Sequence, residues 1–299
     1  ITLVLVLGLI ILVISVLYSG QVVMPMKEVA GSIAMISSGD FNETMQITGY
    51  SEAEDISDKF NSMLSVLQNL EDARQEFVSN VSHELKTPIT SVKVLAESLI
   101  GQENVPVELY QEFMVDINEE LERMNKIIND LLTLVKMDKN ASEVNISEVN
   151  INEFLEAILK QLQPIADKRN IEMIFESVRS VTAQVDEVKL AMAFRNLIEN
   201  AIKYNYDNGW VRVSLNADHK FFYLKVSDSG VGIPEELQDS IFERFYRVDK
   251  ARSRETGGNG LGLAITRNAI LLHRGSIKVH SIEQQGTTFA VRIPLMYSE

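Results

Sequence analysis

The sequence predicts a multidomain chain in which a transmembrane helix, a helical linker and a dimeric four-helix bundle precede a mixed α/β domain. Three observations support this order: an uncharged apolar run at residues 1–23, two long helical patterns up to about residue 140, and strand-like runs between helical patterns after residue 145. With 299 residues, 45% of them hydrophobic, the chain is long enough for more than one packed core.

The composition excludes several classes of function. The chain has 42 acidic and 28 basic residues and a net charge of −14, without a dense block of Lys and Arg, so direct binding to nucleic acid is disfavoured. The absence of cysteine excludes disulfides, zinc-thiolate sites and thiol nucleophiles. Any metal ion must therefore be held by oxygen or imidazole ligands.

Residues 1–23 carry no charged side chain, and their length approaches that of a membrane span. Within the run from Ile1 to Leu17, the only interruptions are Thr2, Gly8 and Ser15. The chain opens inside the apolar run, without the basic start and cleavage site of a signal peptide, so we expect a fragment that begins within a transmembrane helix. The alternative is a buried core helix, which is disfavoured because the run has no polar face.

The next segment, residues 24–75, resembles a HAMP linker. Its first helical pattern starts near Pro25 and ends at Gly39-Asp40-Phe41, and a second begins near Ser51. In the second pattern, Asp55 stands where the HAMP family usually has Glu. A plain coiled-coil stalk is the alternative.

The second helical pattern continues through Pro88 to Leu99, and its apolar residues step by three or four to form one stripe: Val78, Val81, Leu85, Val92, Ala96 and Leu99. His83 lies two residues from Val81 and from Leu85, about 200° around the helix. We therefore expect its imidazole to face solvent.

Another helix is predicted after the turn from Gly101 to Pro106. Its apolar seam consists of Phe113, Ile117, Leu121, Met124, Ile128, Leu131 and Val135. Two such helices cannot enclose a core alone, so residues 76–140 predict a homodimer with a four-helix bundle.

The segment from Phe77 to Pro88 is similar to the phospho-accepting box of sensor histidine kinases. A neutral imidazole such as that of His83 is a good nucleophile near pH 7, and the adjacent Glu84 carboxylate can stabilise positive charge on it. Pro88 has no amide hydrogen for the Glu84 carbonyl, so the helix can bend there. The resemblance gives Thr87 a role in positioning water for dephosphorylation of a partner. Without the surrounding box, a solvated surface histidine would be the preferred interpretation.

The domain expected at residues 145–299 has strand-like runs at Ile171–Phe175, Val211–Leu215 and Phe221–Val226. Its segment from Asn196 to Tyr204 places Asn196 and Asn200 four residues apart on one helix face. An amide oxygen suits Mg²⁺, which prefers oxygen ligands. Taken alone, such a pair is more often a pair of caps or surface amides.

Two glycine-rich segments follow. In the first, Val226 to Pro234, a strand-like run ends in Asp228; by itself this is an ordinary turn pattern. In the second, Gly257 to Ile265, the glycines allow the backbone to approach phosphate, and a helix that starts near Leu261 would present free amides to an anion. Between them, Arg247 can neutralise charge on a terminal phosphate.

These segments resemble the ATP-binding domain that histidine kinases share with gyrase, Hsp90 and MutL, an α/β sandwich known as the Bergerat fold. The resemblance implies that Asp228 accepts a hydrogen bond from the adenine amino group and that Asn200 holds Mg²⁺. It implies that the remaining nucleotide-binding residues are Asn196, Lys203, Tyr204, Gly230, Gly232, Arg247, Gly258, Gly260, Leu261, Gly262 and Thr287. Neither a Walker loop nor the motifs of Ser/Thr/Tyr protein kinases are present.

Over the whole chain, the resemblance implies a bacterial sensor histidine kinase that uses ATP and Mg²⁺ to phosphorylate His83 and transfers the phosphoryl group to an aspartate of a response regulator receiver domain. Dephosphorylation of that partner is a second expected activity. Membrane lipid would surround the N-terminal helix, with the chain cytoplasmic from about residue 24. Phosphorylation within one chain and across the dimer are both compatible with the sequence.

Three alternatives remain. A gyrase-like or Hsp90-like ATPase needs a catalytic carboxylate where this chain has Asn196. A catalytically inactive dimeric adaptor and an enzyme that acts chiefly as a phosphatase are the others. The remaining histidines, His219, His273 and His280, are interpreted as surface or structural residues, and Trp210, Phe221 and Phe222 as core residues.

Overall fold

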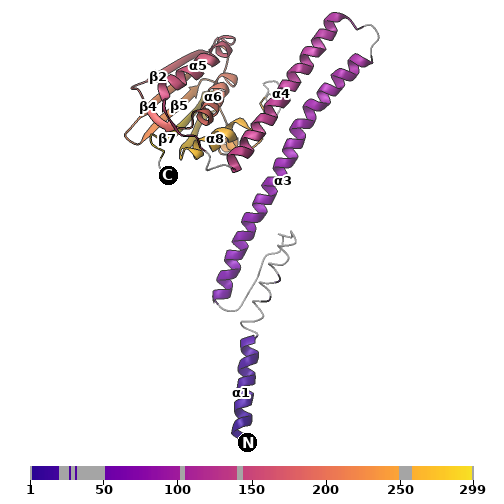
Figure 1. Ribbon diagram of the computed structural model, residues 1–299, viewed down its shortest axis with the longest axis vertical. Coiled ribbons are helices and arrows are strands. Elements are labelled where there is room, and N and C mark those ends of the chain that lie inside the picture. The colour runs from indigo at the N-terminus through magenta and orange to yellow at the C-terminus, as the bar shows by residue number, and fades with distance from the viewer. Residues whose placement is uncertain are drawn as a thin grey trace. The chain divides into compact units, whose positions relative to one another are not determined.

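The computed structural model describes residues 2–19, 27, 31, 51–101, 105–139, 144–248 and 258–297 (Figure 1). Its contacts divide the chain into two compact units, Ile1–Ser82 and His83–Glu299. The HAMP-like features expected at Pro25 and at Gly39 to Phe41 lie outside the described residues. The resemblance to a HAMP linker therefore stays a prediction.

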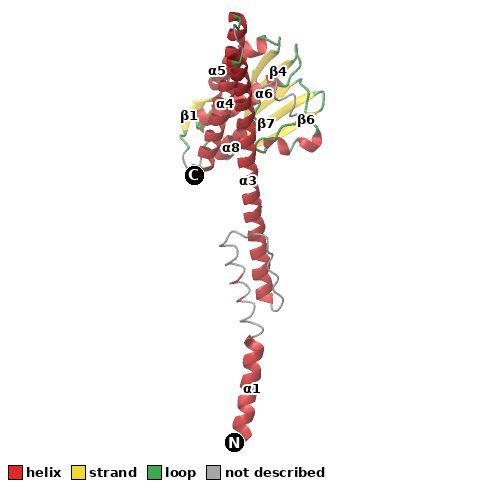
Figure 2. Cartoon of the chain, turned by 90° about the vertical axis from the view of Figure 1, so that its right-hand side faces the viewer, coloured by secondary structure: helices red, strands yellow, loops and turns green. Residues whose placement is uncertain are grey.

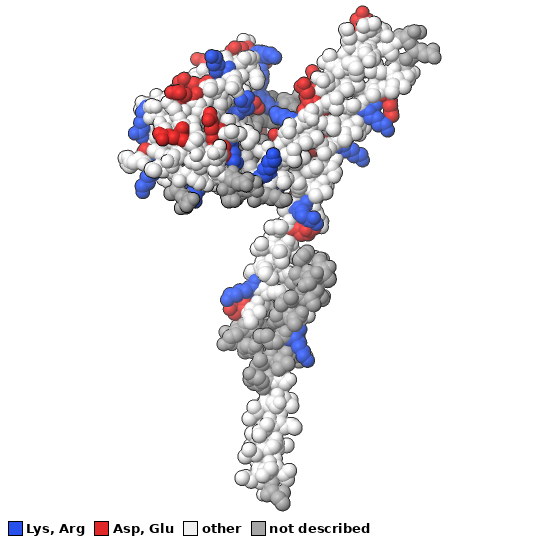
Figure 3. Space-filling model, viewed as in Figure 1, with Lys and Arg blue, Asp and Glu red and all other residues white. Residues whose placement is uncertain are grey.

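In the first unit, α1 spans Thr2–Tyr18 and has no charged side chain (Figure 3). Among the described residues, no helix combines the length and the apolar character needed to cross a membrane. The transmembrane helix predicted at residues 1–23 is therefore not confirmed.

Two long helices follow, as the sequence predicts. Helix α3 spans Ser51–Ile100, with Pro88 inside it, and crosses the boundary between the two units, while α4 spans Val107–Lys139. The hydroxyl of Thr87 donates to the carbonyl of His83 at 3.2 Å, four residues back. Helix α3 therefore continues through Pro88, which removes only the hydrogen bond to the Glu84 carbonyl.

The predicted seam of α4 is divided between two faces. Ile127 and Leu134, which lie outside the predicted seam, are fully buried within the chain. By contrast, four apolar residues spaced by seven are 39–46% exposed: Met114, Leu121, Ile128 and Val135. We call these four residues the exposed α4 stripe. Three of them belong to the predicted seam.

The α/β domain contains both predicted types of element. Its helices are α5 (Ile151–Asp167), α6 (Glu187–Lys203), α8 (Gly262–Leu272) and the short 3₁₀ helices η2 (Glu235–Leu237) and η3 (Ser240–Phe242). Its strands are β1 (Ser147–Asn150), β2 (Glu172–Ser177), β3 (Thr182–Val185), β4 (Trp210–Ala217), β5 (Phe221–Asp228), β6 (Ser276–Ile282) and β7 (Gly286–Pro294). The strand-like runs of the sequence thus lie in β2, β4 and β5.

Five strands form the main sheet in the order β2-β4-β5-β7-β6, with β2 parallel to β4 and every other pair antiparallel. Strands β1 and β3 form a separate antiparallel pair. Helices α5, α6 and α8 cover one face of the main sheet (Figure 2). The result is the two-layer α/β sandwich that the resemblance implies.

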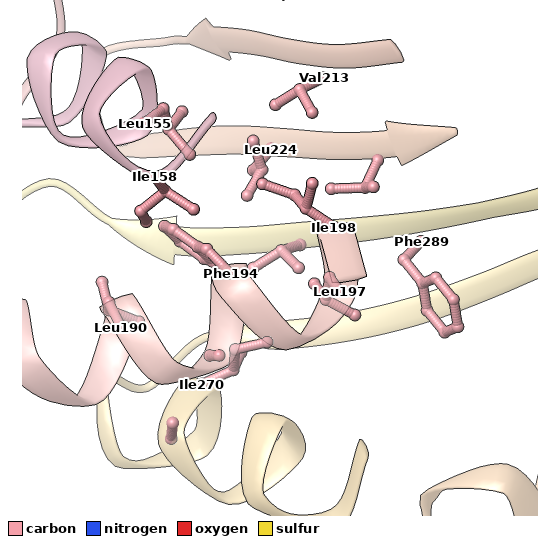
Figure 4. Close-up of a cluster of buried hydrophobic side chains, with 14 of the residues drawn as sticks. Leu155, Ile158, Leu190, Phe194, Leu197, Ile198, Val213, Leu224, Ile270 and Phe289 are labelled. Carbon is pink, nitrogen blue, oxygen red and sulfur yellow. The ribbon is translucent and has the colours of Figure 1, made fainter. Parts of the chain in front are cut away.

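The core lies between these two layers (Figure 4). Alternate residues of β5, Phe222, Leu224 and Val226, are fully buried because successive side chains of a strand point to opposite faces. The same alternation puts Asp228, the last residue of β5, on the buried face. The pattern that builds the core therefore also places a carboxylate at its edge.

The aromatic residues interpreted as core differ in burial. Phe222 is fully buried, but Trp210 and Phe221 are only half-buried. The Arg212 guanidinium lies 5.1 Å from the centre of the Trp210 ring, and Arg292 covers Phe221 in the same way at 4.8 Å. In both strands the residue that follows is buried, so by the alternation of side chains Trp210 and Phe221 lie on the face of the sheet that the helices do not cover.

One histidine has a structural role in the core. His273 is buried, and its Nε2 accepts a hydrogen bond from the Asp186 amide at 2.8 Å, while its Nδ1 lies 2.7 Å from the Ala269 carbonyl. These partners require a neutral ring with its proton on Nδ1. Burial lowers the pKa of His273. His219 and His280 are exposed, so all three fit the interpretation as surface or structural residues.

We expect His273 to make the domain acid-sensitive. Because its pKa is lowered in the folded state, its stabilising contribution is complete above the pKa of the unfolded chain, about 6.5, and is lost as the pH falls through the folded value. His273→Gln should cost roughly 1–3 kcal/mol at pH 7.5 and reduce the further loss of stability towards pH 5. Urea unfolding at several pH values measures both effects.

The matched control is His219→Gln, which should keep the pH dependence of the wild type because its ring is exposed. If the free energy of unfolding depended on pH in the same way in the wild type and in both variants, the assignment of the acid sensitivity to His273 would be wrong.

Candidate functional site

The buried end of β5 forms one side of the candidate site. Asp228 is 8% exposed, and its Oδ1 accepts hydrogen bonds from the amides of Gly230 at 2.9 Å and Thr287 at 3.2 Å. Both bonds fall on Oδ1, which leaves Oδ2 for a ligand. Burial raises the pKa of Asp228 to about 6, although the two amide bonds act to lower it.

Two glycines permit this arrangement. A Cβ atom at Gly230 would lie 2.3 Å from the Tyr204 carbonyl oxygen, and one at Gly286, which has φ +114°, would lie 1.9 Å from the Asp228 carbonyl oxygen. Any side chain at either position would push the backbone of its neighbour away. The structure thus brings together four of the predicted nucleotide-binding residues: Tyr204, Asp228, Gly230 and Thr287.

The second side of the site is the polar face of α6. The side-chain amide of Asn196 donates to the Thr266 hydroxyl at 2.9 Å and so connects α6 with α8. A Cβ atom at Gly262 would lie 2.3 Å from Asn196 Oδ1, so a side chain there would displace the Asn196 amide. Asn200, one turn further along, is half-buried, and its side chain makes no hydrogen bond to the described residues.

Asn200 therefore has a free amide oxygen, the type of ligand that Mg²⁺ accepts beside phosphate and water. Within the described ranges, no group of three or more acidic or histidine side chains is placed to hold a metal ion. The residues present thus fit a metal ion that arrives with a polyphosphate, and not one held by a protein cage.

Lys203 lies at the end of the same face of α6. Its ammonium group lies 5.1 Å from the centre of the Tyr204 ring, and a Cβ atom at Gly258 would lie 2.8 Å from it. Burial lowers the pKa of Lys203 to about 8, and the positive charges of Lys126, Arg247 and Arg123 add to this effect, while Glu199 opposes it. An anion bound among these groups would relieve their mutual repulsion.

The second glycine segment closes the site against α8. Gly260 has φ +69°, and its carbonyl accepts the Phe245 amide at 2.9 Å. Leu261 is fully buried, and α8 begins at Gly262, as predicted. The first turn of α8 has no side-chain cap, so its amides are available to an anion.

One predicted glycine, Gly232, also has a role in the fold. Gly232 has φ +70°, and a Cβ atom there would lie 2.2 Å from the Ile282 carbonyl oxygen. The neighbouring Val231 carbonyl accepts the Gln284 amide at 2.7 Å. The absence of a side chain at Gly232 therefore lets the segment after β5 pack against the turn between β6 and β7.

The predicted phosphoacceptor lies on α3 within the second unit. His83 is exposed, as expected, and lines an open recess of about 620 Å³ together with Lys86, Thr87, Thr90, Ser91, Val94 and Leu95. Glu84 Oε1 lies 3.6 Å from Nη1 of Arg247. The residue next to the nucleophile thus meets the arginine predicted to neutralise the terminal phosphate.

Arg247 is only partly satisfied. Its side chain is 8% exposed, and Nε and Nη2 are buried without a hydrogen-bond partner among the described residues. Buried guanidinium donors that lack acceptors are costly, so this side chain is prepared for an anionic ligand.

Two polar contacts were not predicted from the sequence. Asn259 Nδ2 donates to Asp130 Oδ2 of α4 at 2.6 Å, and burial raises the pKa of Asp130. The two residues are 129 positions apart, so no local pattern signals their contact. Asp186, which precedes the Asn196 segment, caps α6 by accepting the Lys189 amide at 3.0 Å and is a structural residue.

Comparisons with known families agree with this geometry. Residues 73–140 match the His Kinase A (phospho-acceptor) domain, and residues 185–296 match the histidine kinase-, DNA gyrase B- and HSP90-like ATPase family. The combination of a phosphoacceptor domain and this ATPase domain defines a histidine kinase. The chain therefore belongs to the sensor histidine kinases.

Among curated relatives, the chain is 36% identical over 281 residues to the sensor protein kinase WalK of Staphylococcus epidermidis, covering 92% of this chain and 44% of that protein. It is 37% identical over 276 residues to WalK of Staphylococcus aureus, covering 90% of this chain and 64% of that protein. The chain thus spans less than two thirds of either relative.

Solved structures share the fold. Full-length ShkA in complex with AMPPNP is 25% identical, with a TM-score of 0.56 over 75% of this chain and 46% of that one. The Acinetobacter baumannii histidine kinase AdeS is 23% identical, with a TM-score of 0.59 over 71% of this chain and 98% of that one. ThkA in complex with the response regulator TrrA is 24% identical, with a TM-score of 0.62 over 76% and 64%. The last two show a common fold only.

We expect Asp228 to cost stability in the nucleotide-free protein. Because its folded pKa of about 6 exceeds the unfolded value of about 3.9, its favourable contribution is present at low pH and lost as the pH rises through 6. Asp228→Asn should therefore raise the free energy of unfolding by roughly 1–3 kcal/mol at pH 7.5, a gain that shrinks towards pH 4. The same variant should bind ATP at least tenfold more weakly.

Chemical unfolding and nucleotide titration measure the two effects. Asp218→Asn is the control, because hydrogen bonds from the Tyr223 hydroxyl and two amides hold the pKa of Asp218 at about 2. This control should not be stabilised. A loss of stability in Asp228→Asn at pH 7.5 would sink the prediction.

Proposed function

We propose that this chain catalyses ATP-dependent autophosphorylation of His83 and transfers the phosphoryl group to an aspartate of a response regulator receiver domain. The observation that supports this most directly is the contact between Arg247 and Glu84, the residue adjacent to the exposed His83. Two buried donors of Arg247 have no acceptor among the described residues and could bind an anion. The predicted nucleophile, His83, and the predicted phosphate-neutralising group, Arg247, thus lie close together.

The chemistry follows from these groups. A nitrogen of the neutral His83 ring attacks the γ-phosphorus of ATP, a nitrogen–phosphorus bond forms, and the bond to the bridging oxygen breaks so that ADP leaves. Glu84 takes the proton that the ring loses as it becomes positively charged. Arg247 and Lys203 neutralise charge on the transferred group. Catalysis therefore consists of positioning and charge neutralisation.

The nucleotide itself would extend along the site described above. Asp228 Oδ2 is available to the adenine amino group, and the free amides at the start of α8 are available to the phosphates. Asn200 would hold Mg²⁺, which would supply further charge neutralisation on the phosphates. The other residues assigned to nucleotide binding are Asn196, Tyr204, Gly230, Gly232, Gly258, Gly260, Leu261, Gly262 and Thr287.

We infer a homodimer from the exposed α4 stripe. Apolar residues spaced by seven on a helix are typical of a seam between helices, and a second copy of the chain would cover them. A four-helix bundle at residues 76–140 meets this need. The open recess beside His83 remains accessible to a receiver domain, and Thr87, on its wall, is placed to assist dephosphorylation.

We propose that the N-terminal region attaches the enzyme to the cell membrane of a bacterium. Support comes from the sequence, since residues 1–23 are uncharged and apolar and α1 exposes its described side chains. In this proposal residues 24–75 form a HAMP linker, and the chain from about residue 24 onward, including the ATP-binding domain at 145–299, is cytoplasmic.

The test is phosphorylation with γ-labelled ATP and Mg²⁺. The wild type should acquire an acid-labile, base-stable label, and His83→Gln should lose it completely while binding nucleotide with unchanged affinity, because the imidazole is the only group replaced. His219→Gln, another exposed histidine, is the control and should be labelled normally. Label retained in His83→Gln would overturn the site; nucleotide binding without any label in the wild type would favour an adaptor or a phosphatase.

A further inference from the structure

The segment of α4 that contacts the ATP site carries two cations of its own. Asp130 binds Asn259 at 2.6 Å, and Asn259 stands between Gly258 and Gly260 of the second glycine segment. Helix α4 also packs against α8, whose first turn presents free amides. One face of α4 therefore lies against the phosphate end of the site.

Helical spacing determines which residues share that face. Lys126 precedes Asp130 by four residues, and Arg123 by seven, so all three lie within about 60° around α4. Arg123 is half-buried and lies 3.6 Å from Glu120, whereas Lys126 is exposed. The exposed α4 stripe lies on the opposite side of the helix, so a partner helix there would leave Lys126 accessible.

These cations face those of the ATP domain. Burial is the largest cause of the lowered pKa of Lys203, and the positive charges of Lys126, Arg247 and Arg123 add to it; Lys126 also acts on Asp130. The neighbouring negative groups are Glu84, Glu120, Asp130 and Glu199. Two donors of the buried Arg247 nevertheless remain without an acceptor among the described residues. Such a convergence of cations is typical of an anion-binding site.

We infer that Lys126 of α4 completes the phosphate site by contacting the γ-phosphate of ATP, so that the phosphoacceptor domain itself contributes to nucleotide binding. The choice of the γ-phosphate follows from Arg247, which lies beside Glu84 and thus on the side of the site nearest to His83. The adenine end, at Asp228, is the other end of the same site. This inference rests on the proposed function for the orientation of the nucleotide.

The site explains how the chain can distinguish ATP from ADP. With ADP bound, the cations at the His83 end keep their mutual repulsion, whereas ATP places a phosphate among them. Contact between α4 and the ATP domain should then be tighter with ATP than with ADP. Lys126 would act as a substrate-binding and positioning residue, alongside Arg247.

The test compares affinities for AMPPNP and ADP, each with Mg²⁺, in the full chain. Lys126→Gln should weaken AMPPNP binding about three- to tenfold and change ADP binding less than twofold, because only the γ-phosphate loses a partner. Lys126→Arg should retain the preference of the wild type. The matched control is Lys136→Gln, an exposed lysine ten residues further along α4, which should leave both affinities unchanged.

Two outcomes would overturn the inference. An equal loss of affinity for AMPPNP and ADP in Lys126→Gln would mean that Lys126 acts only on Asp130 and the local structure. Unchanged affinities with slower phosphorylation would mean that it acts on the approach of His83 and not on the phosphate. The affinities remain measurable even if wild-type His83 is not labelled, so failure of the proposed function is distinguishable from failure of this inference.

Discussion

The packing of α6 against the main sheet is the constraint on which the site depends. Seven residues of this helix are buried in the core: Leu190, Ala193, Phe194, Leu197, Ile198, Ala201 and Ile202. Asn196, Asn200 and Lys203 lie within about 60° of one another on the remaining face. Because the apolar face can dock in only one rotation, the polar face is fixed toward α8 and the second glycine segment. The packing of α6 in the core thus also determines the geometry of the site.

Several groups of the site are buried, which makes their charged forms unfavourable. Burial raises the pKa of Asp228 and lowers that of Lys203, so both groups are displaced toward their neutral forms. Among the described residues, two donors of the buried Arg247 guanidinium have no acceptor. A nucleotide offers a hydrogen-bond donor to Asp228 and negative charge to Lys203 and Arg247. The free protein is therefore less stable than its core alone would allow, which is a common property of binding sites.

Much of this architecture can be predicted from the sequence because it follows from local patterns. Apolar periodicity predicts both long helices and three strands, and glycine placement predicts the start of α8 near Leu261. Gly232 shows a limit, since a glycine pattern alone does not reveal that the Ile282 carbonyl lies where a Cβ atom would be. Likewise, the buried role of His273 depends on Asp186, which is 87 residues away.

The contacts between α4 or α3 and the ATP domain could not be predicted for the same reason. Glu84 with Arg247 and Asn259 with Asp130 join residues that are distant in the chain, and each is polar, so no hydrophobic period marks it. The separation of the apolar residues of α4 into a buried and an exposed set is also invisible to periodicity, because the residues of both sets are spaced by seven. Only the three-dimensional packing separates them.

The strict seven-residue spacing of the exposed α4 stripe has a geometric consequence. A straight α-helix drifts by about 20° per heptad, so the stripe turns by roughly 60° between Met114 and Val135. A neighbouring helix that touches all four side chains must wind around α4 in a left-handed superhelix. Any torque that loosens or tightens this winding rotates α4 about its own axis, and the face that carries Lys126 and Asp130 rotates with it. In the homodimer proposed above, twist applied at one end of the bundle would thereby move Lys126 relative to the phosphates.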